Sequence, residues 1–330
     1  MVGLRSHARR DGAGDFALSV RVIFFGTPAF AVPSLDALAR LAAAGQIELA
    51  AVVTQPDRPG DRGRLAPSPV KEHAMALGIP VMQPVLLTGD AATPLLGLRP
   101  EALVWAAYGN LIPRKLIDAV DGRALNVHAS LLPRWRGASP VARAIQAGDR
   151  ETGITLMQGT AGLDRGPVVA SARTEIGADE TAGELTARLA QLGGALLERE
   201  LIPFLAGRTT PVPQDDAAAT WAPKLTTADG ELRFTEPAEA LQRQVRAMTP
   251  EPGAWTTYRG QRLGVTRVFV TGGRGVQHGT FELRDGVPHV AAGAGWLRLD
   301  EVRLAGRRAM TGSDWARGLR DLGAEPRLPS

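Results

Sequence analysis

The sequence predicts an α/β fold with a mostly parallel sheet, followed by a smaller all-β domain, and three observations lead to this prediction. From Val20 onward, apolar runs alternate with segments of helical periodicity, which is typical of βα units. Residues 208–219 are rich in proline and polar residues and follow neither the helical nor the strand period, as a linker would. Short segments of alternating polarity follow Lys224, and these indicate a small closed β-barrel.

The first domain is expected at residues 20–206. Its first two strands are predicted at Val20–Phe25 and Ile47–Thr54, with a helix around residues 35–39 between them and a polar loop, Gln55–Pro67, after the second. Ser68 and Pro69 then have the types that begin a helix. Later strands are predicted at Ala102–Ala107, Ala124–His128, Ile154–Gln158 and Val168–Thr174, and a capping box, Thr181 with Glu184, precedes a long helix that ends near Ala206. Because the strands are apolar throughout, helices should cover both faces of the sheet.

The remaining residues divide into a linker at 207–223 and a second domain at 224–330. That domain should contain one helix at Ala238–Met248 and strands at Trp255–Tyr258, Leu263–Val270, Gly279–Leu283, Val287–Ala291 and Trp296–Val302. Residues 1–19 lack the apolar core of a secretory signal, so we expect them to be a disordered extension.

Composition excludes several classes of protein. The chain has no cysteine, which removes disulfides, thiolate metal sites and cysteine nucleophiles and favours a cytoplasmic location. No apolar run approaches the roughly 20 residues of a membrane span. Neither a GxGxxG nor a P-loop pattern occurs, and no His, Asp and Glu have metal-ligand spacing, so we expect no NAD and no metal. The net charge of +4 is compatible with a polyanionic partner.

Three polar residues are candidates for catalysis. Asn126 and His128 alternate with apolar neighbours on a buried strand, so both side chains should lie on one face near its carboxyl end, where ligands of such sheets collect. An imidazole can act as acid or base near neutral pH, and an amide can donate to a developing oxyanion. Asp164 lies in a glycine-flanked turn. The alternatives are a hydrogen-bonded core histidine beside a turn asparagine, and an aspartate that only forms the turn.

The region from Asn126 to Gly166 resembles the formyltransferase family. The resemblance is carried by the run Asn126-Val127-His128-Ala129-Ser130-Leu131-Leu132-Pro133 with Arg134-Trp135-Arg136-Gly137, and by Gly162-Leu163-Asp164-Arg165-Gly166. Other segments are similar to the branch of that family that formylates methionyl-tRNA, namely Phe25-Gly26-Thr27-Pro28, Thr54-Gln55-Pro56-Asp57-Arg58-Pro59, Pro67-Ser68-Pro69-Val70-Lys71, Ala107-Tyr108-Gly109 and Leu111-Ile112-Pro113. Together these segments extend over essentially the whole chain after Val20.

The resemblance implies a Rossmann-like catalytic domain and a C-terminal, tRNA-binding barrel resembling an OB-fold. It implies transfer of a formyl group from 10-formyltetrahydrofolate to the amino group of initiator methionyl-tRNA by a cytoplasmic enzyme, which we expect to be a monomer. By matching positions, the resemblance implies that Asn126, His128 and Asp164 are catalytic. It also implies that folate binds at Ser130, Leu131, Leu132 and Pro133. The amide and a protonated imidazole would stabilise the oxyanion, while Asp164 orients the imidazole and assists proton transfer.

The loop Gln55–Pro67 is expected to bind tRNA. It follows the second strand at the ligand-binding edge of the sheet, and it offers Arg58, Arg62 and Arg64 to a phosphate backbone. It has no apolar face with which to dock on the core, so we expect it to be mobile without RNA.

Three other functions remain open. A sugar-nucleotide formyltransferase would share most of these motifs, although the loop Thr54–Pro59 argues against it. A glycinamide-ribonucleotide formyltransferase would not need the second domain. A non-catalytic RNA-binding or folate-binding relative would not need Asn126, His128 and Asp164 together.

Overall fold

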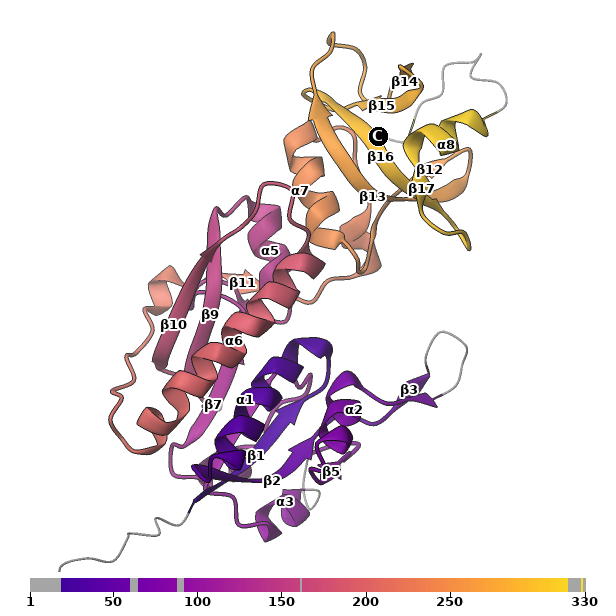
Figure 1. Cartoon of the computed structure of the whole chain (residues 1–330). Coiled ribbons are helices and arrows are strands. Elements are labelled where there is room, and N and C mark those ends of the chain that lie inside the picture. The colour runs from indigo at the N-terminus through magenta and orange to yellow at the C-terminus, as the bar shows by residue number, and fades with distance from the viewer. Residues whose placement is uncertain (1–18, 60–64, 88–91, 161, 320–327, 329–330) are drawn as a thin grey trace, which may run out of the picture.

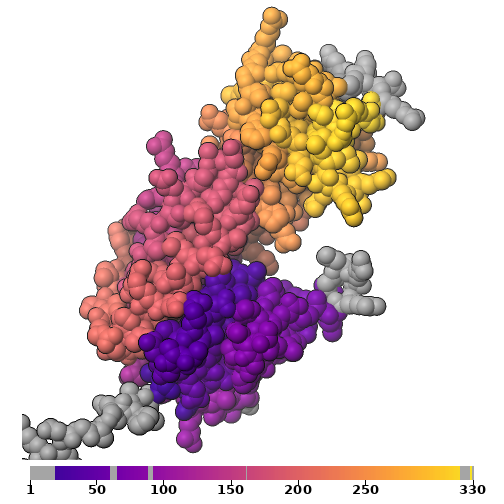
Figure 2. All heavy atoms as spheres, viewed as in Figure 1, coloured from indigo at the N-terminus to yellow at the C-terminus, as the bar shows by residue number. Residues whose placement is uncertain are grey.

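The computed structural model describes residues 19–59, 65–87, 92–160, 162–319 and 328. Figure 1 shows a larger α/β domain and a smaller domain built on a second sheet, joined end to end. The space-filling view shows that the chain is elongated, with the second domain seated on one end of the first (Figure 2). The predicted extension, apart from residue 19, lies outside the described residues. Among the residues that are described, no helix is both long enough and apolar enough to cross a bilayer.

The first domain contains a seven-stranded sheet with the order β10-β9-β7-β6-β1-β2-β5. Its strands are β1 (Val20–Gly26), β2 (Ile47–Val53), β5 (Val81–Met82), β6 (Ala102–Ala106), β7 (Ala124–His128), β9 (Glu151–Gln158) and β10 (Val168–Glu175). Neighbours from β7 to β5 pair in parallel, whereas β9 runs antiparallel to both β7 and β10. The prediction of a mostly parallel sheet is therefore confirmed. The six predicted strands have bounds within three residues of those expected, whereas β5 was not predicted.

Helices cover the sheet on both sides. The helices of this domain are α1 (Val32–Ala43), α2 (Pro69–Ala76), α3 (Thr93–Gly97), α4 (Arg114–Asp118), α5 (Pro140–Ala147) and α6 (Ala182–Leu205), with a 3-10 turn at Ala29–Ala31. Val22 and Phe24 of β1 belong to the core that includes α1 and α6, whereas Ile23 and Phe25 belong to a second core with α3 and α4. Helix α6 begins with the expected capping box between Thr181 and Glu184.

In its described residues, the second domain consists of an antiparallel sheet and two helices. Its strands follow the order β12 (Ala254–Tyr258), β13 (Gln261–Thr271), β16 (Trp296–Leu304), β15 (Val287–Ala291) and β14 (Phe281–Arg284), with β17 (Met310–Thr311) beside β16. Helix α7 (Ala238–Met248) has the predicted bounds and packs on α5 and β13, and α8 (Gly312–Arg317) packs on β15 and β16. Tyr258 of β12 and Phe281 of β14 bring the outer strands together, because their rings lie 6.2 Å apart and both contact Trp315. Closure of this sheet by strand pairing stays a prediction.

The segment expected to be a linker is attached to the first domain along its length. Val212 forms a bridge with Val168 at the start of β10. A 3-10 turn at Asp216–Ala218 leads to β11 (Trp221–Ala222), which pairs in parallel with β8 (Arg136–Gly137). A further 3-10 turn, Thr227–Gly230, opens the second domain. The linker therefore lies directly against the residues that follow β7.

Candidate active site

Strand β7 separates apolar and polar side chains by its period of two. Leu125 and Val127 lie in the core shared with α6. Asn126 and His128 point to the opposite face of the sheet, and each is 6% exposed. Because buried polar groups need hydrogen-bond partners, both side chains require polar contacts from outside the strand.

Asp164 provides that polar contact from the turn between β9 and β10. Its carboxylate Oδ1 lies 3.3 Å from Nδ2 of Asn126 and 3.7 Å from Nδ1 of His128. Its other oxygen, Oδ2, accepts a hydrogen bond of 2.8 Å from the backbone amide of Gly137. Asp164 itself is 7% exposed. The expected proximity of Asp164 to His128 is confirmed, and the three predicted catalytic residues form one buried polar cluster.

The imidazole of His128 is oriented by a second contact. Nε2 lies 2.9 Å from the carbonyl oxygen of Trp135. A carbonyl oxygen can only accept, so Nε2 carries a hydrogen and Nδ1 faces Asp164. In the neutral ring Nδ1 therefore holds the lone pair, and it is the nitrogen that can take up a proton beside the carboxylate. The Trp135 carbonyl thus orients the ring, and the Asp164 carboxylate, 3.7 Å from Nδ1, would stabilise the imidazolium.

The turn predicted to bind folate follows His128 directly and is held rigid by internal hydrogen bonds. The Ser130 hydroxyl is buried and donates to the carbonyl of Arg134 over 2.6 Å. Thr155 Oγ1 of β9 donates to Ser130 O and accepts from the amide of Leu132. The side chain of Ser130 thus stabilises the turn, and Leu131, Leu132 and Pro133 are half-buried, so their contact with a folate stays a prediction.

Two glycines, which the sequence pattern marks only as members of the two motifs, allow the chain to pass close to this cluster. Gly137 has φ +122°, and a Cβ there would lie 2.6 Å from the carbonyl oxygen of Ala222. At Gly166 a Cβ would lie 1.7 Å from the carbonyl oxygen of Gln158. The only local signal was their position beside Arg136 and Asp164 in the two motifs.

Trp221 is a further residue that the sequence analysis missed. It lies on β11, next to β8, and is 50% exposed. The guanidinium of Arg165, from the turn that holds Asp164, lies 5.7 Å from the centre of its ring. An exposed aromatic ring beside an arginine is suited to stacking on a base.

The expected tRNA-binding loop begins and ends in a small ribbon of β3 (Arg58–Pro59) and β4 (Leu65–Ala66). At its base, Asp57 accepts hydrogen bonds from Lys71 over 2.7 Å and Gln83 over 2.8 Å. The hydrogen bond from Lys71 lowers the pKa of Asp57, and that from Gln83 adds to the effect. Arg58 is exposed and contacts Gln55. Arg62 and Arg64 lie outside the described residues, so their roles stay predictions.

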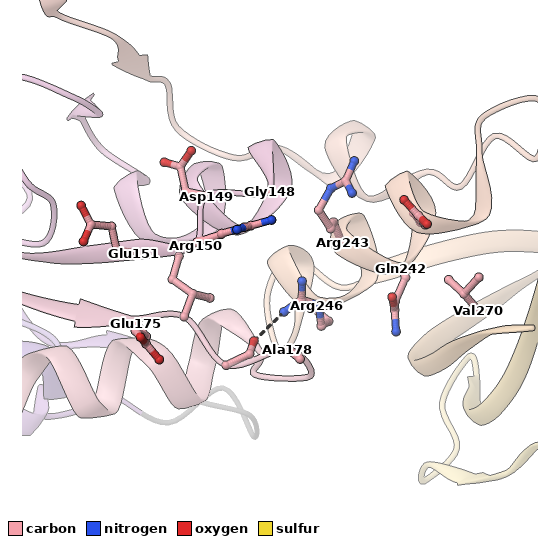
Figure 3. A pocket seen from close by; sticks show the side chains of 13 residues that line it. Gly148, Asp149, Arg150, Glu151, Glu175, Ala178, Gln242, Arg243, Arg246 and Val270 are labelled. Carbon is pink, nitrogen blue, oxygen red and sulfur yellow. Dashed lines mark hydrogen bonds between the residues drawn. The ribbon is translucent and has the colours of Figure 1, made fainter.

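A cavity of about 790 Å³ lies elsewhere, between the two domains. Figure 3 shows Arg243 of α7 across from Arg150, Arg246 of α7 hydrogen-bonded to the loop beside Ala178, and Glu175 of β10 nearby. None of the three candidate catalytic residues lines it. In the described part of the chain, no three His, Asp or Glu side chains gather as ligands for a metal ion.

Two family signatures match this sequence. The signature described as formyl transferase matches residues 20–201, and that described as formyl transferase, C-terminal domain, matches residues 224–320. A methionyl-tRNA formyltransferase of Halorhodospira halophila is 45% identical over 317 residues, which is 94% of this chain and 99% of that one. One from Acidithiobacillus ferrooxidans is 46% identical over 305 residues, 91% of this chain and 96% of the other.

Solved structures share the fold at low sequence identity. An N-formyltransferase from Helicobacter canadensis, in complex with folinic acid and dTDP-3-aminofucose, has a TM-score of 0.65 and 16% identity, and the match covers 85% of this chain and 98% of that one. HypX from Aquifex aeolicus in complex with tetrahydrofolic acid has a TM-score of 0.59 and 18% identity, over 89% of this chain and 46% of that one.

Proposed function

The chain belongs to the formyltransferase family, among the methionyl-tRNA formyltransferases, and we propose that it transfers the formyl group of 10-formyltetrahydrofolate to the amino group of initiator methionyl-tRNA. The observation that carries the proposal is the buried cluster of Asn126, His128 and Asp164 in a chain that matches such enzymes over nearly their full length. An enzyme of translation initiation would act in the cytoplasm.

The reaction joins the methionyl nitrogen to the formyl carbon and breaks the bond from that carbon to N10 of the folate. Attack by the neutral amine produces a tetrahedral oxyanion and a positively charged nitrogen. The amine proton must then leave, and N10 must receive a proton as it departs. No covalent bond to the protein is needed, so the task of the protein is to stabilise charge and move one proton.

The geometry of the cluster suits each of these tasks. Asn126 uses one amide hydrogen on Asp164 over 3.3 Å, which leaves its second N–H for the oxyanion. Nδ1 of His128 can receive the amine proton and return it to N10, while Nε2 stays hydrogen-bonded to Trp135. Asp164 provides the negative charge beside the imidazolium. The amide of Gly137 holds the other carboxylate oxygen, so the carboxylate cannot turn away.

The donor would bind as a substrate beside this cluster. The Ser130–Pro133 turn starts two residues after His128, and its backbone is fixed by Thr155. Leu131, Leu132 and Pro133 are only partly covered, so they can contact the flat ring system of a folate. This would place the formyl group near Asn126 and His128 without requiring the side chain of Ser130.

The acceptor would extend from this cluster toward the second domain. Arg165 lies in the turn that carries Asp164 and contacts Trp221 of β11, and these two side chains can stack on the unpaired end of a tRNA. The arginines of the Gln55–Pro67 loop would contact the phosphate backbone. The second domain, which carries a slight excess of basic residues, would bind more distant parts of the RNA.

A direct assay distinguishes this function from its alternatives. Purified protein is given 10-formyltetrahydrofolate with methionyl-tRNA, a dTDP-amino sugar or glycinamide ribonucleotide as acceptor. We expect kcat/KM for methionyl-tRNA to exceed that for either small acceptor by at least about 10³-fold, since only the tRNA can use binding energy from both domains. Faster formylation of the sugar nucleotide would overturn the proposal in favour of the sugar-nucleotide alternative, and no transfer to any acceptor would favour a non-catalytic protein.

A further inference from the structure

Among the described residues, Arg136 is the largest side chain that is fully buried, and the side chains that it contacts there, Gln214 and Asp216, come from the linker. It lies on β8 and is 1% exposed. Its Nε and Nη2 donate to Oε1 of Gln214 over 3.0 and 2.8 Å. Its Nη1 lies 2.7 Å from the carboxylate of Asp216, whose side chain is 72% exposed. Because a buried guanidinium without partners is costly, these contacts fix the linker segment in place.

Gln214 connects this arginine to the turn that carries Asp164. Its amide nitrogen Nε2 donates to the backbone carbonyls of Asp164 over 3.0 Å and Gly166 over 2.7 Å. Arg136 has only donors and the two carbonyls only accept, so the side-chain amide of Gln214 can have just one orientation. All of its hydrogen-bonding capacity toward the protein is used between Arg136 and this turn.

The turn needs such support because the backbone conformation at Asp164 is energetically unfavourable. Asp164 has φ +50°, a left-handed conformation that costs a non-glycine residue on the order of 1 kcal/mol or more. Its side chain is held by Asn126 and by the amide of Gly137. Its carbonyl group is held by Gln214 alone among the side chains of the described residues.

We propose that Gln214 is a positioning residue for formyl transfer: with Arg136 behind it, it holds Asp164 at the distance from His128 and Asn126 that the reaction requires. This inference rests on the proposed function of Asp164. It makes the segment between the two domains part of the catalytic apparatus rather than a spacer.

Two substitutions test the proposal in the full-length enzyme. Gln214→Glu keeps an acceptor for Arg136 but loses both donors and places a carboxylate beside two carbonyl oxygens. Gln214→Ala removes the connection altogether. Gln191→Glu makes the same chemical change as the first at an exposed position of α6 and is the control. We expect kcat to fall about 10- to 100-fold in both Gln214 variants, with KM for methionyl-tRNA and for the folate within about threefold, because the interaction acts on transition-state charge. The control should match the parent.

A further measurement separates positioning from a general loss of structure. In a double-mutant cycle, Gln214→Ala combined with Asp164→Asn should be no slower than Asp164→Asn alone, since Gln214 acts through that carboxylate.

Each outcome has a distinct meaning. Parental kcat in folded Gln214 variants, or additive losses in the cycle, would each overturn the positioning role. An Asp164→Asn variant with parental kcat would instead remove Asp164 from the mechanism, and with it the proposed catalytic cluster. If Gln214→Ala does not fold, the kcat of Gln214→Glu and the same cycle run with Gln214→Glu still decide the matter.

Discussion

The Nε2 atom of His128 is hydrogen-bonded over 2.9 Å to the carbonyl oxygen of Trp135, seven residues further along the chain. This contact assigns the ring hydrogen to Nε2 and turns Nδ1 toward Asp164. Trp135, whose carbonyl orients the imidazole, therefore belongs to the same segment that begins at strand β7. Residues 128–135 thus contain both the imidazole and the carbonyl that orients it. Asp164 supplies the negative charge from a turn that is distant in the sequence.

Removal of either polar group of β7 should slow the chemical step. We expect His128→Ala and Asn126→Ala each to lower kcat by on the order of 10²-fold or more, with little change in folate affinity, because both groups act on charge present only in the transition state. His73→Ala is the control, since His73 pairs with Asp36 between α2 and α1. Steady-state kinetics and folate titration check this, and kcat within a few-fold of the parent would remove either residue from the mechanism.

Much of the first domain and the core of the site could be predicted because their signals are local. The alternation in Ala124–His128 placed Asn126 and His128 on one face, and the capping box at Thr181 marked the start of α6. The proximity of Asp164 to His128 could be predicted only from the family resemblance, because the sequence of its turn gives no information about which residues it contacts. The short helices α3, α4 and α5 were missed because five to eight residues are too few for a clear period.

The role of the linker could not be predicted, and the reason is physical. Residues 208–219 show neither the helical period nor the strand period. Their structure comes from contacts with another segment rather than from their own pattern. Gln214 lies 78 positions from Arg136, and nothing in the types of those two residues indicates that they meet. Strands of two residues, such as β8 and β11, likewise exist only because they pair with each other.

Gly166 should tolerate no side chain. We expect Gly166→Ala to lower the free energy of unfolding by about 1–3 kcal/mol and to reduce kcat, because a Cβ 1.7 Å from the carbonyl oxygen of Gln158 forces the turn away and moves Asp164 with it. Gly272→Ala is the control, since a Cβ at that position meets nothing within 4 Å. Urea unfolding together with initial rates tests this, and parental values for both quantities would contradict the close packing described for this turn.

Stability should depend on pH through Asp229, which joins the two domains. Its carboxylate accepts from the hydroxyl and amide of Thr226 and from Arg143 of α5 over 2.8 Å. The Thr226 hydroxyl, then its amide, then Arg143 lower the pKa of Asp229 from 3.8 to about 2. A lowered pKa in the folded state stabilises the protein above the unfolded value, and that contribution is lost as pH falls from about 4 to about 2.

The substitution Asp229→Asn isolates this contribution. We expect the parent to exceed the variant in free energy of unfolding by on the order of 1 to 2 kcal/mol at pH 7, and the difference to shrink as pH approaches 2. Asp118→Asn, which alters an exposed pair with Arg114 on α4, should show a much smaller difference at every pH. Denaturant unfolding across pH 2 to 7 provides the comparison, and a difference independent of pH would show that the carboxylate charge is not responsible.

The last prediction concerns the loop Gln55–Pro67 as a clamp for tRNA. Its base is fixed to the domain, because Asp57 binds both Lys71 and Gln83. Arg58 on β3 is exposed to solvent. The loop follows β2 at the carboxyl edge of the parallel strands, the edge at which such sheets bind their ligands. A fixed base with arginines beyond it suits contact with a phosphate backbone.

Arg62→Ala should therefore raise KM for methionyl-tRNA and leave KM for the folate unchanged. Loss of one phosphate contact reduces the number of counterions released on binding, so the plot of log kcat/KM for methionyl-tRNA against log salt should become less steep by about one unit at most. The defect should then be largest at low salt and narrow as salt rises. Arg114→Ala, on the exposed surface of α4, is the matched control and should retain the parental slope. If Arg62→Ala has the parental kcat/KM for methionyl-tRNA at every salt concentration, Arg62 makes no contact with tRNA that matters for the reaction, and the clamp would have to depend on Arg58 and Arg64.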